Sequence, residues 1–208
     1  MKKIFNTKGV TLAEIMVTMA VLLMVFIIAA SSDMDKQKKR EEFYKNVGQA
    51  VTLMRTSRNY AISNEVFDAE GGGNPTVPEG GFGVFVEKID SPEPSASFTL
   101  FIDIKDENGD LTPNGKFDIS HDEILNTFTM SSGSYIETMS ANGTNFATGE
   151  KEVVIIFTPP SADMHINKNN GSANDFNELE IVFSCSLSRF YFKVNSISKF
   201  FETRKEVI

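Results

Sequence analysis

The sequence has little of the chemistry that most enzymes and metalloproteins use. Its 208 residues include one cysteine, two histidines and no tryptophan. Because a disulfide needs two cysteines, Cys185 cannot form one within the chain, and one Cys with two His cannot make a Cys/His zinc cluster. The fold must therefore be stable without a covalent cross-link or a structural zinc.

No sequence pattern typical of an enzyme is present. There is no P-loop, no Gly-x-Ser-x-Gly sequence and no zinc-binding motif. His121 and His165 lie far apart in the sequence, and each is better explained as a solvated loop residue than as a catalyst. Cys185 falls on the expected inward face of a strand, where a thiol usually acts as a small apolar side chain. We therefore expect a protein that is not an enzyme and has no cofactor.

Charge is unevenly distributed along the chain, whose net charge is −8. Residues 65–208 contain ten basic and 23 acidic side chains, whereas residues 34–64 contain seven basic and three acidic ones. An acidic domain repels polyanions over most of its surface, so nucleic acid is not an expected partner.

One long hydrophobic run lies near the N-terminus. From Val10 to Ala30, Glu14 is the only ionisable residue among 21 positions. A helix of that length measures about 30 Å, which is enough to cross the hydrocarbon core of a bilayer. A carboxylate at that depth is costly and would lack a partner in an isolated helix, so Glu14 is a candidate functional residue.

The residues before this run form a recognisable pattern. Three lysines of the leader are followed by Gly9-Val10-Thr11-Leu12-Ala13-Glu14. The pattern resembles the prepilin signal of type IV pilins and type II secretion pseudopilins, whose usual sequence is Gly-Phe-Thr-Leu-Ile-Glu. The resemblance implies cleavage after Gly9 by a membrane-embedded prepilin peptidase and methylation of the new amine of Val10. It also implies a single-pass inner-membrane protein whose extracytoplasmic domain enters a periplasmic or extracellular filament.

The hydrophobic run is also compatible with a secretory signal or with a plain membrane anchor. An ordinary secretory signal would offer small residues at Ala29-Ala30-Ser31, but its apolar core is usually about 7–15 residues long. A plain membrane anchor accounts for the length of the run but accounts for neither Gly9 nor Glu14.

The rest of the chain is predicted to continue as a helix and then to form strands. Residues 34–64 contain no proline and have apolar side chains at helical spacing, which indicates an amphipathic continuation of the helix of residues 10–33. After a loop rich in Gly and Pro, residues 65–208 contain seven strand patterns, at Phe82–Val86, Phe98–Ile104, Glu123–Met130, Tyr135–Thr138, Val153–Thr158, Leu179–Cys185 and Phe190–Asn195. The run Val153–Phe157 is apolar throughout, which is typical of a strand that is buried on both faces.

These elements predict an α+β fold with four regions. Residues 1–9 form a leader peptide, and residues 10–33 and 34–64 form one long helix whose first half is transmembrane. The second half would pack on the β-rich globular domain of residues 65–208, which is an antiparallel β-sheet or β-sandwich.

The order of elements resembles the GspH/FimT-type minor pseudopilins. The segment Arg58–Val66 looks like the helix exit of that family, and Phe101–Asp103 with Asn114–Asp118 looks like its acidic Asn-Gly loop. The resemblance implies a structural subunit, a minor pilin or pseudopilin of a type IV pilus or type II secretion-type filament. Its implied partners are other pilin or pseudopilin subunits, the prepilin peptidase and an inner-membrane assembly platform. Within such a filament, the amine of Val10 would meet Glu14 of a neighbouring subunit and both charges would be satisfied.

Two alternative functions belong to other classes. Residues 186–208 contain basic side chains among aromatic ones, a composition that can bind single-stranded DNA, so a DNA-uptake minor pilin of a competence fibre is the first. A monomeric membrane-anchored binding protein is the second.

The acidic segment between Asp103 and Glu123 is a candidate calcium site. Asp110, Asn114 and Asp118 fall at the first, fifth and ninth positions of a pattern similar to an EF-hand loop. The twelfth position is His121, whereas an EF-hand has a bidentate Glu there. Because an Asn-Gly pair also makes a good turn without any metal, a calcium site and a bare acidic turn both stay open.

Overall fold

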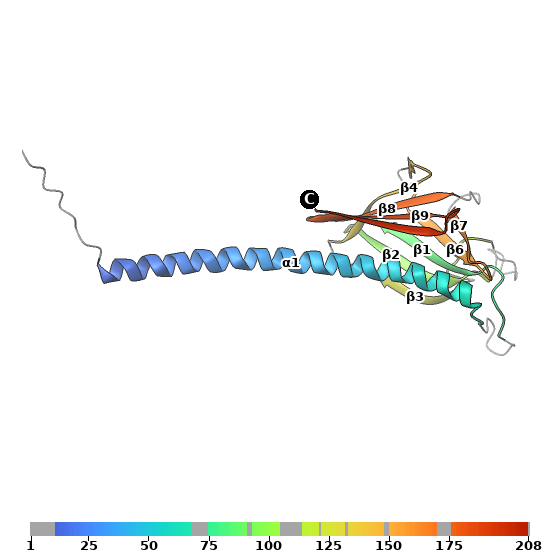
Figure 1. Ribbon diagram of the computed structural model, residues 1–208, viewed down its shortest axis with the longest axis horizontal. Coiled ribbons are helices and arrows are strands. Elements are labelled where there is room, and N and C mark those ends of the chain that lie inside the picture. Colours follow the sequence, from blue (N-terminus) through green and yellow to red (C-terminus); the bar gives the residue numbers. More distant parts are fainter. Residues whose placement is uncertain are drawn as a thin grey trace, which may run out of the picture. The chain divides into compact units, whose positions relative to one another are not determined.

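A computed structural model of the chain describes residues 11–67, 75–90, 93–104, 114–120, 122–131, 133–147, 150–169 and 176–207. These residues form one α-helix and ten β-strands (Figure 1). The chain divides into two compact units, Met1–Glu41 and Glu42–Ile208.

Helix α1 runs from Leu12 to Ser63 and begins with a capping box. The hydroxyl oxygen of Thr11 accepts the backbone N–H of Glu14 (3.2 Å), and a carboxylate oxygen of Glu14 accepts the backbone N–H of Thr11 (2.8 Å). These reciprocal hydrogen bonds satisfy N–H groups that the first turn of a helix leaves without intrahelical partners. At the other end Asn64 has a φ of 49°, which is the left-handed conformation that commonly terminates a helix.

Among the residues that the structure describes, no helix is long and apolar enough to cross a membrane. This finding contradicts the predicted transmembrane helix. It also contradicts the predicted localisation as a single-pass inner-membrane protein with an extracytoplasmic domain.

The first sheet contains five antiparallel strands in the order β3-β2-β1-β6-β7. Their bounds are β1 Phe82–Ile89, β2 Ser95–Ile102, β3 Glu123–Thr129, β6 Glu152–Thr158 and β7 Asp163–Lys168. The apolar run Val153–Phe157 lies in β6, between β1 and β7, and its five side chains are buried. Both faces of this part of the sheet are therefore covered.

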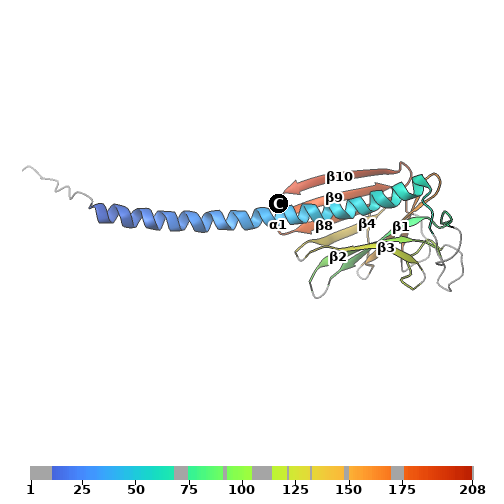
Figure 2. The same cartoon turned by 90° about the horizontal axis from the view of Figure 1, so that it is seen from below.

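The second sheet also contains five antiparallel strands, in the order β10-β9-β8-β4-β5. Their bounds are β4 Tyr135–Ala141, β5 Thr144–Asn145, β8 Glu178–Cys185, β9 Ser188–Asn195 and β10 Phe200–Val207. Figure 2 shows β10, β9 and β8 as neighbours in this sheet. Side chains of β9 alternate strictly between buried and half-buried, so one face of the strand contributes to the core.

One hydrophobic core joins the two sheets and the part of α1 that follows Glu42 (Figure 2). Phe43, Ala50 and Met54 come from α1 and have no exposed surface. Helix and sheet are also joined by a buried hydrogen bond of 2.7 Å from the hydroxyl of Ser57 to the carbonyl oxygen of Phe82. Because Ser57 is itself fully buried, this bond removes the cost of an unsatisfied hydroxyl in the core.

The architecture corrects the predicted fold class. The globular part is built mainly from ten strands in two five-stranded antiparallel sheets, whereas the sequence predicted an α+β protein organised around a half-transmembrane helix. Three strands, β5, β7 and β10, lie outside the seven predicted strand patterns. β5 is only two residues long, β7 has only two apolar residues among six, and β10 is rich in charge, so none has the sustained apolar alternation of a half-buried strand.

Candidate functional site

The first candidate site is the apolar part of α1 between Leu12 and Ile28, which we call the apolar segment. Its large hydrophobic side chains are exposed by 46% (Ile15) to 76% (Leu12). These side chains point to all sides of the helix, so none of its sides is polar along the whole segment. They belong to Leu12, Ile15, Met16, Val17, Met19, Val21, Leu22, Leu23, Met24, Val25, Phe26, Ile27 and Ile28. A helix that is hydrophobic on all sides is normally buried on all sides, so the apolar segment requires a surrounding partner.

Glu14 lies in the first turn of this segment and is already bound within its own chain. One carboxylate oxygen accepts the backbone N–H of Thr11 at 2.8 Å and lies 3.0 Å from the Thr11 hydroxyl. The backbone hydrogen bond from Thr11, followed by the side-chain one, holds the pKa of Glu14 below its usual value. Thr11 was not predicted as a partner, although the Thr-x-x-Glu spacing is the signature of a capping box. The predicted cleavage residues Gly9 and Val10 lie outside the described residues.

The second candidate site is the acidic segment, residues 103–123, whose two ends each carry a buried carboxylate. Asp103, which is 1% exposed, accepts the backbone N–H groups of Asn114 (3.4 Å) and Gly115 (2.9 Å). Asp122, which is 9% exposed, accepts those of Ile104 (3.4 Å) and Asp118 (2.8 Å). Asp122 therefore ties the two ends of the segment together, and Asp103 ties its first residue to the turn at residues 114–115.

Burial makes these two carboxyl groups weak acids. Loss of water raises the pKa of Asp103 to about 6, although its two backbone hydrogen bonds lower it. Loss of water likewise raises the pKa of Asp122 to about 7, and repulsion by Asp103 raises it further. Both groups therefore change charge close to neutral pH, whereas an exposed Asp does so at about pH 4. The sequence pattern does not indicate this difference.

Phe117 anchors the acidic segment on the outer face of the first sheet. Its ring lies 4.6 Å from that of Phe85 and 4.9 Å from that of Phe101, between ring centroids. Together with Val154 and Ile156, these two rings form a second small hydrophobic cluster. A glycine at position 83 leaves room for the Phe101 ring, because a Cβ there would clash with it.

Two asparagines, Asn167 in β7 and Asn169 just after that strand, hold the same segment. The side chain of Asn167 donates to the carbonyl oxygen of Gly115 at 3.1 Å. The side-chain oxygen of Asn169 accepts the backbone N–H of Phe117 at 2.9 Å. The turn at residues 114–118 is therefore fixed by polar contacts as well as by the Phe117 ring.

The structure places only two of the three predicted calcium ligands. Asn114 uses its side-chain oxygen to accept the N–H of Lys116 (2.8 Å), and Asp118 uses one oxygen to accept the N–H of Ser120 (2.9 Å). Asp110 lies outside the described residues, as does His121. Within the described part of the chain, no group of three or more His, Cys, Asp or Glu side chains could hold a metal ion. Calcium binding stays a prediction.

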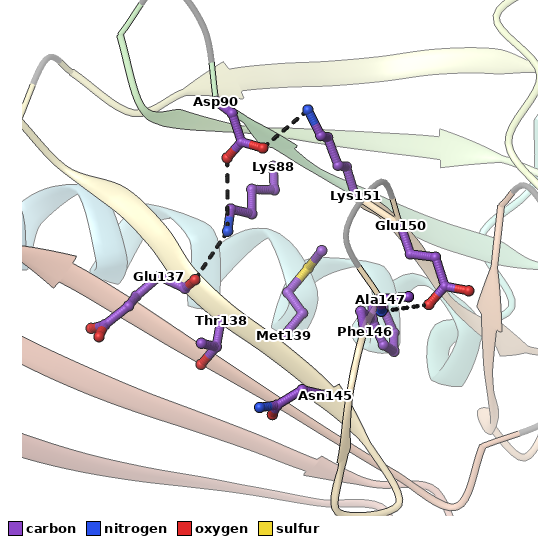
Figure 3. Close-up of a pocket in the computed structure, with 10 residues that line it drawn as sticks. All are labelled: Lys88, Asp90, Glu137, Thr138, Met139, Asn145, Phe146, Ala147, Glu150 and Lys151. Carbon is purple, nitrogen blue, oxygen red and sulfur yellow. Dashed lines mark hydrogen bonds and ion pairs between the residues drawn. The ribbon is translucent and has the colours of Figure 1, made fainter.

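A cavity of about 250 Å³ opens beside β4 and β5, and Figure 3 shows the side chains that line it. Lys88 and Lys151 approach Asp90 from two sides, with N–O distances of 3.7 and 3.0 Å. Lys88 also donates to the carbonyl oxygen of Glu137 at 3.0 Å. The charged groups of this cavity already have partners in the protein, so the cavity has no evident ligand.

Several of the basic and aromatic C-terminal side chains make contacts within the domain. Arg189, Lys193 and Lys199 pair with carboxylates at 2.6, 2.9 and 2.6 Å. Phe190 and Phe192 are buried in the core and cannot stack on bases. These five side chains therefore serve contacts within the domain, and the DNA alternative stays a prediction.

The remaining candidates from the sequence lie in the sheets. His165 is in β7 and not in a loop, and Cys185 is a buried free thiol at the end of β8. Comparison of the chain with family models, with curated proteins and with solved structures finds no match. The absence of a match and of a spanning helix among the described residues contradicts the predicted membership among type IV pilins and GspH/FimT-type pseudopilins.

Proposed function

We propose that this chain is a non-enzymatic structural subunit that assembles with other subunits into a filament through the apolar segment of α1. The observation that carries the proposal is the exposure of apolar side chains on every side of residues 12–28. This is the assembly function expected from the sequence, and it rests on the helix surface and not on a family likeness.

A filament accounts for the apolar segment better than a pair of chains does. Successive residues of a helix point about 100° apart, and a single partner helix covers only one stripe of its surface. Burying one Val, Leu, Ile, Met or Phe side chain contributes about 1.5–3 kcal/mol. With 13 such side chains exposed, packing among several neighbours would exceed the association cost of roughly 4–15 kcal/mol.

Glu14 is proposed to set the register of the assembly. Removal of residues 1–9 would leave the cationic amine of Val10 four positions before Glu14. In a staggered array of helices, the amine of one chain would meet the carboxylate of a neighbour, and the pairing would satisfy both charges away from water. In the isolated chain, Thr11 holds the same carboxylate at the start of the helix.

The proposal is tested by a matched pair of substitutions in the full-length chain. Val21 and Ile197 are both exposed apolar residues, but only Val21 lies in the apolar segment. Val21→Asp should abolish large assemblies in sedimentation and electron microscopy, because it buries an unpaired charge at the contact. Ile197→Asp should leave them intact. Assembly of both variants at the level of the unaltered chain, or a monomeric unaltered chain, would refute the proposal.

A further inference from the structure

Two Asn-Gly pairs among the described residues differ in their surroundings, although both lie in turns. They are Asn114-Gly115 in the acidic segment and Asn142-Gly143 between β4 and β5. Both glycines have positive φ, 72° and 76°. In an Asn-Gly pair the backbone nitrogen of the glycine has no neighbouring side chain to shield it, so it can attack the amide carbon of the asparagine side chain.

At the first pair, a base touches the attacking group. The N–H of Gly115 donates to the carboxylate of Asp103 at 2.9 Å. Asp103 directly follows β2 and is buried, so the position of its carboxylate is fixed by the sheet. A general base must lie within hydrogen-bonding reach of the proton that it removes, and this distance meets that requirement.

A hydrogen-bond donor touches the group that is attacked. The side-chain oxygen of Asn114 accepts the backbone N–H of Lys116 at 2.8 Å. This bond polarises the carbonyl of the side-chain amide, and it would stabilise the negative charge that develops on the oxygen when a nucleophile adds to the carbon. The base is therefore the Asp103 carboxylate, the nucleophile is the backbone nitrogen of Gly115, and the activated carbonyl is that of the Asn114 side chain.

The second pair, Asn142-Gly143, also has hydrogen-bond donors at its asparagine side chain but has no base at its glycine nitrogen among the described residues. The side-chain oxygen of Asn142 accepts the N–H groups of Asn177 and Glu178, both at 3.1 Å. Among the described residues, no carboxylate accepts the N–H of Gly143. The chain thus contains its own comparison for the effect of Asp103.

We propose that Asn114 is a site of spontaneous cyclisation and deamidation assisted by Asp103. Asp103 takes the proton of the Gly115 nitrogen while that nitrogen forms a bond to the side-chain carbon of Asn114. The bond from this carbon to the amide nitrogen of Asn114 then breaks, and ammonia leaves with the proton from Asp103. Water opens the resulting succinimide to aspartate or isoaspartate at position 114. No oxidant, reductant or cofactor is consumed.

The product changes the charge of the acidic segment. Deamidation adds a negative charge to a residue whose backbone N–H donates to the Asp103 carboxylate. Repulsion between this charge and the Asp103 carboxylate weakens the contacts that hold the turn. Deamidation would thereby act as a slow, irreversible change in the surface that carries Phe117.

The test is peptide mapping by mass spectrometry of the full-length protein during incubation at neutral pH. Position 114 should show the mass increase of deamidation, with aspartate and isoaspartate as the two products, faster than position 142. In denaturant the two rates should become similar, because only the folded chain places Asp103 at Gly115. Asp103→Asn should slow the reaction at 114 by about a hundredfold in the folded protein, the low end of what a general base typically contributes.

Asp118→Asn is the matched control, since it changes an acid to an amide in the same segment without a contact to Gly115. It should leave the rate at 114 unchanged. Circular dichroism and the rate at 142 show whether each variant is folded. Equal native rates at 114 and 142, or an unchanged rate at 114 in folded Asp103→Asn, would overturn the proposal.

Discussion

Asp122 makes a specific contribution to the pH dependence of stability. Its carboxyl group is buried at the end of the acidic segment, and loss of water raises its pKa from 3.8 to about 7. A carboxyl group whose pKa is raised in the folded state binds its proton more tightly there than in the unfolded chain. The stabilisation is therefore complete below about pH 4 and is lost as the pH rises through 7.

The size of this effect follows from the pKa difference. Each pKa unit corresponds to about 1.4 kcal/mol, so a shift of three units amounts to roughly 4 kcal/mol as an upper limit. Asp103 is buried nearby and raises the pKa of Asp122 by repulsion, so the two contributions are not independent. We expect the free energy of unfolding to fall by a few kcal/mol between pH 5 and pH 8.

Asp122→Asn should flatten this dependence, because an amide cannot ionise. Urea denaturation at pH 5, 6, 7 and 8 with a chelator present measures it directly, and the slope with pH is the quantity to compare. Asp163→Asn is the control, because Lys199 and then Ser161 lower the pKa of the exposed Asp163 and it stays ionised over this range. The reasoning is refuted if Asp122→Asn loses as much stability between pH 5 and pH 8 as the unaltered protein.

Other predictions concern the anchor, the cap, maturation and calcium. Phe117→Ala should lower the free energy of unfolding by about 2 kcal/mol, because the contacts with two aromatic rings are lost. The loss is smaller than for a fully buried Phe, since Phe117 is only half-buried. Urea denaturation measures it, and no change would mean that the ring does not anchor the segment. Glu14→Gln keeps an oxygen for Thr11 but removes the charge, so it should block assembly if the amine of a neighbouring chain is the partner of Glu14. Normal assembly of Glu14→Gln in sedimentation would show that only the helix cap matters. Intact-mass analysis should show loss of residues 1–9, and a mature start at Ser31 would contradict cleavage after Gly9. A bare acidic turn predicts the same melting temperature with millimolar calcium and with chelator, whereas a calcium site would raise it by several degrees.

Local patterns in the sequence located most of the strands. The alternation Leu179-Ile181-Phe183-Cys185 corresponds to the buried face of β8, and the continuous apolar run Val153–Phe157 corresponds to a covered strand. β7 was missed because its sequence DMHINK has only two apolar residues, Met164 and Ile166, and is polar at the other four positions. Asn167 is nevertheless buried there, and its side chain contacts the turn of the acidic segment, a neighbour that is 52 residues away.

The candidate sites were less accessible to sequence reasoning. The role of Thr11 was readable, since a capping box has a fixed spacing, but the buried pair Asp103 and Asp122 was not. Their burial depends on the closure of the acidic segment onto the sheet through Phe117, which is a property of the tertiary structure. The surface run of acidic residues indicated the sign of the charge but not the environment that raises the pKa of these two groups.

Disulfide cross-linking of the apolar segment would test the central claim most directly. The only native cysteine, Cys185, is buried and can be replaced by serine, after which a single cysteine is placed at Val21 or at Ile197 in the full-length chain. Mild oxidation of assembled protein should join chains through position 21, because neighbouring helices pack there, and should leave chains with a cysteine at position 197 largely unlinked. If position 21 stays unlinked in assemblies, or if the chain with a cysteine at 21 remains a monomer, the apolar segment is not the assembly surface.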